Sequence, residues 1–127
     1  MLELLVAAIA SPGFLGCKSF VAPEARAVRR PAEIVFACGD GNFYATGLRW
    51  SRWMNTAATA SGIGHQNDCR PYCAAGHFHT YPLVVTLARP ARCGRSRRLE
   101  FTRVSWHFPA ARPRGVARSG SESFRCS

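Results

Sequence analysis

Six cysteines in a chain of 127 residues constrain the fold of this sequence more than any other feature. A chain of this length holds one domain, and a domain of this size has a limited hydrophobic core. Small cysteine-rich domains are commonly exported proteins in which disulfides supplement the core, although cysteine also binds zinc. The cysteines therefore predict either a disulfide-stabilised exported domain or a metal site.

The foldable part of the chain is predicted to be a β-domain at residues 33–108. Apolar residues alternate with polar ones there, and none of its segments has the 3.6-residue apolar period of a helix. We expect an all-β fold of about five strands, either a small antiparallel β-sandwich or a partly closed barrel, stabilised by disulfides. The expected strands are residues 34–38, 43–53, 56–64, 81–87 and 99–108.

The apolar residues of the last expected strand change face along its length. Leu99 and Phe101 share one parity, whereas Val104 and Trp106 share the other. Because alternate residues of a strand point to opposite faces, this change predicts a bulge near Thr102 or a strand that moves between sheets.

Both ends of the chain are predicted to lie outside the domain. Residues 1–32 form a signal-like segment and linker, since their apolar start is too short to span a bilayer and Ala25-Arg26-Ala27 has the form of a processing site. Leu15-Gly16-Cys17 resembles a lipoprotein box, which would attach lipid through Cys17. Residues 109–127 are rich in Arg, Pro, Gly and Ser and are expected to form a disordered basic tail. A secreted or cell-surface location follows.

Four cysteines inside the domain are the disulfide candidates: Cys38, Cys69, Cys73 and Cys93. Four cysteines allow three pairings. A Cys69–Cys73 bridge closes a small loop and removes little entropy from the unfolded chain. We therefore favour pairing Cys38 with one of Cys69 or Cys73 and Cys93 with the other, and the Cys69–Cys73 bridge stays open as the alternative.

A zinc site is the competing interpretation of the same segment. His65, Cys69, Cys73 and His77 follow one another at four-residue steps, and zinc binds these residue types. Pro71 prevents a regular helix from presenting such a series on one face, and zinc modules use closer cysteine pairs. We therefore predict no metal and no cofactor, with a zinc protein as an alternative.

Catalytic motifs are sparse in this sequence. It has no nucleophile elbow, phosphate-binding loop or metalloprotease motif, so we predict no catalytic residues and lean against an enzyme. The alternative is a small extracellular enzyme with its site in the 67–79 loop, where a cysteine beside His77 or His79 could be a nucleophile.

Weak ligand-binding candidates are Trp53, Arg52, His77 and His79. Leu48 and Trp50 share one parity of the second expected strand, which favours the core, whereas Trp53 falls on the opposite parity. An exposed tryptophan stacks on sugars or peptides, and Arg52 beside it could be a cation–π partner.

The chain is strongly basic, with 17 Lys+Arg against 7 Asp+Glu and a formal net charge of +10. Much of this charge lies in the two ends, and the cysteines point outside the cell. An anionic envelope polymer or lipid surface is therefore a simpler partner than nucleic acid, which remains an alternative.

The central sequence resembles a group of small exported actinobacterial proteins of unknown function. The resemblance covers about residues 30–108 and rests on CGDGN at 38–42, LRWSRW at 48–53, ATASG at 58–62 and NDCRPYCAAGHFHTYP at 67–82. It implies a β-rich domain in the envelope or medium and carries no established activity. We expect an exported, non-enzymatic β-domain that acts as a cell-envelope or extracellular binding or structural module.

Overall fold

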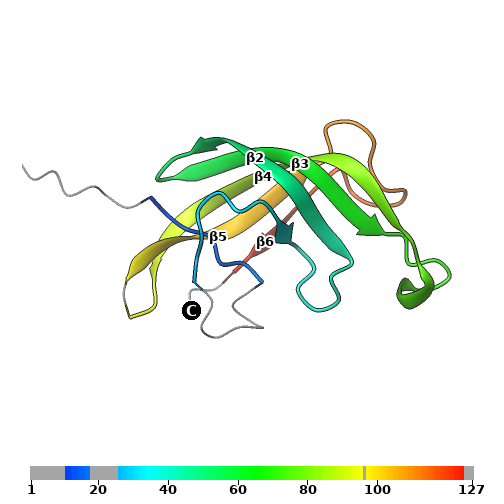
Figure 1. Cartoon of the computed structure of the whole chain (residues 1–127), viewed down its shortest axis with the longest axis horizontal. Helices are drawn as coiled ribbons and strands as arrows, with labels where there is room; N and C mark the ends of the chain where they lie inside the picture. The colour runs from blue at the N-terminus through cyan, green and yellow to red at the C-terminus, as the bar shows by residue number, and fades with distance from the viewer. Residues whose placement is uncertain (1–10, 18–25, 96, 125–127) are drawn as a thin grey trace, which may run out of the picture.

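The computed structural model of the protein describes residues 11–17, 26–95 and 97–124. In this part of the chain, six strands form one antiparallel sheet in the order β1-β2-β3-β4-β5-β6, so strands adjacent in sequence are adjacent in the sheet. The sheet curls into a half-barrel (Figure 1), which confirms the all-β, partly closed barrel. The strands are β1 (Ile34–Val35), β2 (Phe43–Trp53), β3 (Ala57–Asn67), β4 (Phe78–Cys93), β5 (Arg98–His107) and β6 (Ser119–Ser123).

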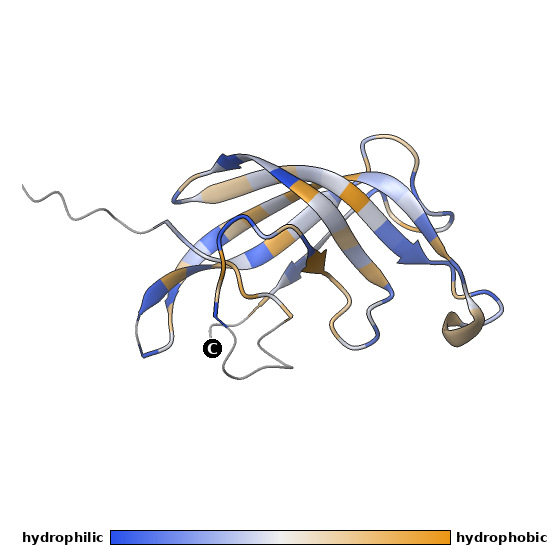
Figure 2. Ribbon diagram, viewed as in Figure 1, coloured by the Kyte–Doolittle hydropathy of each residue, from blue (hydrophilic) through white to orange (hydrophobic). Residues whose placement is uncertain are grey.

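The long strands form where apolar and polar residues alternate (Figure 2). In β4, Leu83, Val85 and Leu87 are buried and face the concave side of the sheet. Val84 and Thr86 lie between them on the convex side and are partly exposed. This two-residue period gives the sheet one core face and one solvent face.

The core on the concave side is closed by the segment that precedes β1. The Gly13 N–H donates to Leu99 O (3.0 Å), and the Phe101 N–H donates to Gly13 O (2.8 Å), so this segment pairs with the start of β5. From the other side, Trp53 Nε1 donates to Pro12 O (2.9 Å). The segment therefore bridges β2 and β5 across the open side of the half-barrel.

Phe14 of this segment belongs to the core, with 4% of its surface exposed. The domain therefore includes residues 12–14, which the sequence had assigned to the signal-like segment before residue 33. The sequence concealed this because the segment contributes one large side chain and no strand-like alternation. Residues 1–10 and 18–25 of the signal-like segment lie outside the described residues.

The C-terminal tail that was predicted to be disordered also contains ordered structure. Residues 119–123 form β6, which pairs with β5 along its whole length, as at Gly120 opposite Trp106. Beyond β6, the Phe124 N–H donates to Thr102 O (2.7 Å). The strand was missed because β6 is largely exposed and carries small polar residues, so it has no apolar period.

The change of face predicted within 99–108 is present, but it is not a register bulge. Phe101 and Val104 are both buried although their parities differ. β4 and β5 pair in the same register before and after Thr102. Opposite Thr102, Arg89 of β4 adopts a left-handed conformation (φ 53°). Thr102 Oγ1 donates to Arg89 O (2.7 Å) and so links the two strands at the position where the buried face changes.

Two disulfides are described, and their pairing differs from the favoured scheme. Cys17 is bonded to Cys38, and Cys69 is bonded to Cys73. Cys93 is disulfide-bonded as well, and none of the described cysteines is a free thiol. The favoured pairing of Cys38 with Cys69 or Cys73 was wrong, and the small-loop alternative is the one found.

These bridges also bear on two alternatives that the sequence left open. The sulfur of Cys17 is engaged with Cys38, so it is not available for a lipid thioether. The sulfurs of Cys69 and Cys73 are engaged with each other, so they cannot serve as thiolate ligands of zinc. No helix in the described part of the chain has the length and apolar character needed to cross a membrane.

Candidate functional site

A cleft is lined by residues of the β3–β4 loop and of the connection between β5 and β6. Both connections lie at the same end of the sheet (Figure 1). The volume of the cleft is about 290 Å³. Its lining comes from the end of β3, the start of β4 and the two connections. The residues whose side chains decide its chemistry are Asp68, Arg70, His79, Tyr81, Arg114 and Val116.

Asn67 fixes the base of the β3–β4 loop. Its side chain is buried, and its Nδ2 donates to Asn42 Oδ1 (3.0 Å) and to Cys73 O (2.8 Å). Its Oδ1 accepts from the Cys69 N–H (3.0 Å). A buried amide that makes all these bonds is costly to displace, so the loop has one preferred position. The Cys69–Cys73 bridge closes the same turn covalently.

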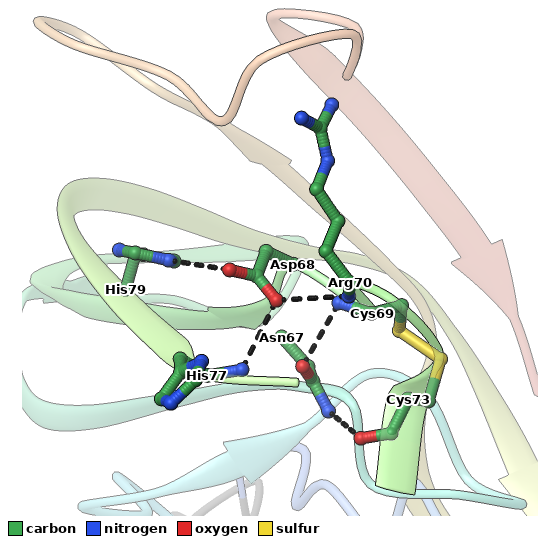
Figure 3. Close-up of polar contacts among 7 residues, drawn as sticks. All are labelled: Asn67, Asp68, Cys69, Arg70, Cys73, His77 and His79. Carbon is green, nitrogen blue, oxygen red and sulfur yellow. Dashed lines mark hydrogen bonds and ion pairs between the residues drawn. A yellow bond between two sulfur atoms is a disulfide. The ribbon is translucent and has the colours of Figure 1, made fainter. Parts of the chain in front are cut away.

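Asp68 organises the side of the loop that faces the cleft (Figure 3). Its Oδ1 accepts from the N–H groups of His77 and Arg70, each at 3.0 Å. Its Oδ2 accepts from His79 Nε2 at 2.9 Å. The His77 N–H, then His79 and the Arg70 N–H, hold the pKa of Asp68 well below its usual range, because each favours the ionised carboxylate.

Gly76 allows this close arrangement. A Cβ at this position would collide with Asn67 Oδ1 and would lie 3.0 Å from Asp68 Oδ1 and 2.8 Å from the Cys69 nitrogen. Only glycine lets the returning chain approach the two anchoring side chains so closely.

Two arginines give the cleft its charge. The Arg70 side chain points away from Asp68, toward the connection between β5 and β6 (Figure 3). Arg114 lines the cleft from that connection. Asp68 is the one carboxylate among the described residues that line the cleft, and its oxygens already accept from His79 and two N–H groups. The cleft therefore has excess positive charge, with Tyr81 and Val116 as apolar wall.

The structure separates the four binding candidates. His79 lines the cleft, whereas His77 contributes its backbone N–H to Asp68 and has an exposed side chain. Arg52 and Trp53 belong to β2 and do not line it. Of the two segments that hold the predicted binding residues, only the 67–79 loop contributes to the cleft. Arg114 was missed because it lies in the presumed tail, and Tyr81 because alternation marked it only as a strand residue.

Trp53 is not the exposed aromatic platform that its parity predicted. Its ring packs edge-on against Phe101 (5.4 Å) and Trp50 (4.8 Å), and it is partly buried against the core. The reason is a register shift between Trp50 and Arg52, which returns Trp53 to the concave face. Trp50 lies against the core, as expected.

The remaining histidines do not join the cleft. His65 stacks on Tyr44 (4.5 Å between ring centroids) and its Nε2 lies 2.7 Å from Thr46 Oγ1. His107 is exposed on β5. Across the described ranges, no group of three His, Cys, Asp or Glu side chains is placed to hold a metal ion.

Comparison with known protein families, curated proteins and solved structures found no match to this chain.

Acid is expected to leave the cleft loop ordered to an unusually low pH. Because the pKa of Asp68 is lower in the folded protein, its stabilisation is complete above the unfolded value of about 4. That stabilisation is lost only as the pH falls through the lower folded value. The backbone amides of Arg70 and His77 should stay protected from hydrogen exchange at pH 3, as followed by NMR. In Asp68→Asn, their protection should no longer change with the titration of residue 68. An Asp68 side chain that titrates near 4 would contradict the arrangement.

Proposed function

We propose that the protein is an exported, non-enzymatic binding module that holds a small anionic ligand in the cleft between the 67–79 loop and the β5–β6 connection. The ligand carries a carboxylate or phosphate group next to an apolar or aromatic part. Arg70 and Arg114 neutralise the anion, Tyr81 and Val116 contact its apolar part, and His79 lines the same cleft.

The observation that carries this proposal is the charge imbalance of the cleft. Arg70 and Arg114 line it from two different connections, while the carboxylate of Asp68 is engaged by backbone N–H groups and by His79. A guanidinium forms paired hydrogen bonds with a carboxylate or phosphate, and these are stronger when water is partly excluded. An anion from solution completes the charge balance of this site.

Export is supported by the disulfides. Two bridges in a small β-domain fit an extracellular location, because cytosolic reductants keep such thiols reduced. We propose that the protein is secreted or retained at the cell surface, a location that fits the resemblance of its central sequence to small exported actinobacterial proteins. An envelope polymer that bears carboxylates or phosphates would supply the ligand.

A small extracellular enzyme is the second candidate, because the Asp68–His79 pair is one that orients an imidazole as a general base. The described lining of the cleft includes no Ser, Thr or free Cys side chain that could serve as a nucleophile. An enzyme at this site would therefore have to activate water. His79→Gln would abolish turnover by such an enzyme but only weaken binding by a module.

Replacing the two cleft arginines is expected to remove anion binding. Phenyl phosphate is titrated into the full chain, and binding is followed by NMR. Inorganic phosphate, which has no apolar part, is titrated in the same way for comparison. Arg70→Gln and Arg114→Gln should each weaken binding by about ten- to a hundredfold, since a charge-assisted hydrogen bond contributes roughly 1.5–3 kcal/mol. Inorganic phosphate should bind more weakly than phenyl phosphate. Arg97→Gln/Arg98→Gln, which removes two exposed charges at the β4–β5 hairpin, is the matched control. Equal affinity in the double Arg70/Arg114 variant and in the control would refute the proposed site.

A further inference from the structure

The convex face of the sheet carries a row of hydroxyl groups that runs across four strands. Thr59 is the register partner of Thr86, Thr86 of Ser105, and Ser105 of Ser121. Register partners point to the same face, and neighbouring strands lie about 4.8 Å apart, so the row extends over about 14 Å. Directly paired hydroxyl residues on consecutive strands give a regular spacing of donors and acceptors.

A hollow of about 370 Å³ lies along this row, over β4, β5 and β6. It is open to solvent, and its sides are mainly polar. The polar side chains that line it are Thr86, Arg103, Ser105, His107, Ser119 and Ser121. No carboxylate is among the described residues that line it.

Positive charge borders the row on both sides. On β2, Arg52 is the register partner of Thr59, and Arg49 is the partner of Ser61 in the neighbouring row. On β5, Arg103 lies next to Ser105, and its Nη2 donates to Ser121 Oγ (3.1 Å). The Arg52 and Arg49 side chains are exposed, so their charges are available to a ligand.

We propose that this convex face binds a linear anionic polysaccharide, laid across the strands along the hydroxyl row. Sugar hydroxyls exchange hydrogen bonds with Thr59, Thr86, Ser105 and Ser121, and the uronate or sulfate groups pair with Arg52 and Arg103. This surface is separate from the cleft, and its proposal does not rest on the proposed function of the cleft.

Other polyanions fit this face less well. Single-stranded nucleic acid needs aromatic rings on which bases stack, but the tryptophan at the hollow, Trp106, is partly buried and packs its ring against Phe36 (4.8 Å) and Phe43 (5.3 Å). A membrane surface needs apolar side chains that enter the lipid, whereas the lining of the hollow offers hydroxyls and cations. A polymer that carries both hydroxyls and anionic groups uses all the groups that the row presents.

The test measures binding of the full chain to polygalacturonate, with neutral dextran as the comparison polymer. We expect polygalacturonate to bind and dextran not to bind. The Arg52→Gln/Arg103→Gln variant should weaken the affinity at least tenfold and flatten its dependence on salt. The Thr86→Val/Ser105→Ala variant should also weaken binding, but with the salt dependence kept, because it removes hydrogen bonds and no charge.

A charge-matched control separates this face from net charge. Arg97→Gln/Arg98→Gln removes two charges at the β4–β5 hairpin, away from the row, and should retain polygalacturonate binding. If it lowers the affinity as much as Arg52→Gln/Arg103→Gln, binding follows net charge and the proposal is overturned. If Arg70→Gln/Arg114→Gln lowers the affinity more than Arg52→Gln/Arg103→Gln, the polymer binds at the cleft, which also overturns the proposal. An oligonucleotide or a vesicle of anionic lipid that binds more tightly through Arg52 and Arg103 would overturn it in favour of that partner.

Discussion

Replacing Phe14 by alanine is expected to lower the free energy of unfolding by about 3–5 kcal/mol, which is a large part of the stability of a small domain. Phe14 is almost completely buried, and its ring meets Phe124 edge-on at 5.6 Å between centroids. The Phe14 N–H and C=O also pair with Val28 (2.8 and 3.0 Å), so the surrounding backbone cannot easily collapse into the cavity that the substitution leaves.

Phe78→Ala is the matched control for this experiment. It removes the same side chain from β4, where Phe78 is 46% exposed. We expect a loss of about 1 kcal/mol or less, because a surface substitution opens no cavity in the core. Urea denaturation of both variants gives the two values. Equal losses would show that the segment before β1 does not seal the core.

The same contacts bear on processing of the chain. Cleavage after Ala25-Arg26-Ala27 would remove Pro12, Gly13 and Phe14 from the structure that they complete. It would leave Trp53 Nε1 without its acceptor at Pro12 and would open the concave side of the core. A domain without residues 12–14 would therefore lack the contacts that close the concave side of its core.

The long strands β2 to β5 could be predicted because each has one face in the core. The buried Leu83, Val85 and Leu87 are separated by residues of the solvent face, and this alternation is visible in the sequence. The strand ends were less well predicted. β4 extends from 78 to 93, beyond the expected 81–87, because ladder hydrogen bonds continue where alternation has ended.

Other parts of the fold depend on contacts between residues far apart in the chain. Cysteine spacing does not show which sulfurs meet, so the Cys17–Cys38 bridge could not be derived from it. The bulge that turns Trp53 inward depends on pairing between β2 and β3. The edge strand β6 is held by its ladder with β5 and has no hydrophobic pattern of its own.

Only one side of the candidate cleft, the 67–79 loop, could be predicted, because the other side depends on contacts between residues far apart in the chain. The 67–79 loop stood out because it concentrates Asp, Cys and His with turn residues, and Asp68 and His79 do meet there. Arg114 reaches the cleft only because β6 returns beside β5 and brings its preceding connection over the end of the sheet. Such a contribution requires knowledge of the topology.

Removing the Cys17–Cys38 bridge is expected to be the second large loss of stability. The bridge joins cysteines 21 residues apart, whereas the Cys69–Cys73 bridge joins cysteines 4 residues apart. The entropy that a bridge removes from the unfolded chain rises with the logarithm of loop length, which gives about 3 kcal/mol for the longer loop and about 2 kcal/mol for the shorter one. Each bridge is removed as a double Cys→Ser variant, so that no unpaired thiol of that bridge remains to exchange with another disulfide.

The two variants should also differ in what else they change. Cys17 lies directly after the segment that seals the core, so Cys17→Ser/Cys38→Ser also frees that segment to detach, and its loss should reach or exceed the entropic value. Cys69→Ser/Cys73→Ser leaves the core untouched but loosens the loop that holds Asp68 and Arg70. Phenyl phosphate affinity should therefore fall in the second variant at temperatures where both are folded, and stay near the wild-type value in the first. The opposite pattern would show that the cleft depends on the core-sealing segment and not on its own bridge.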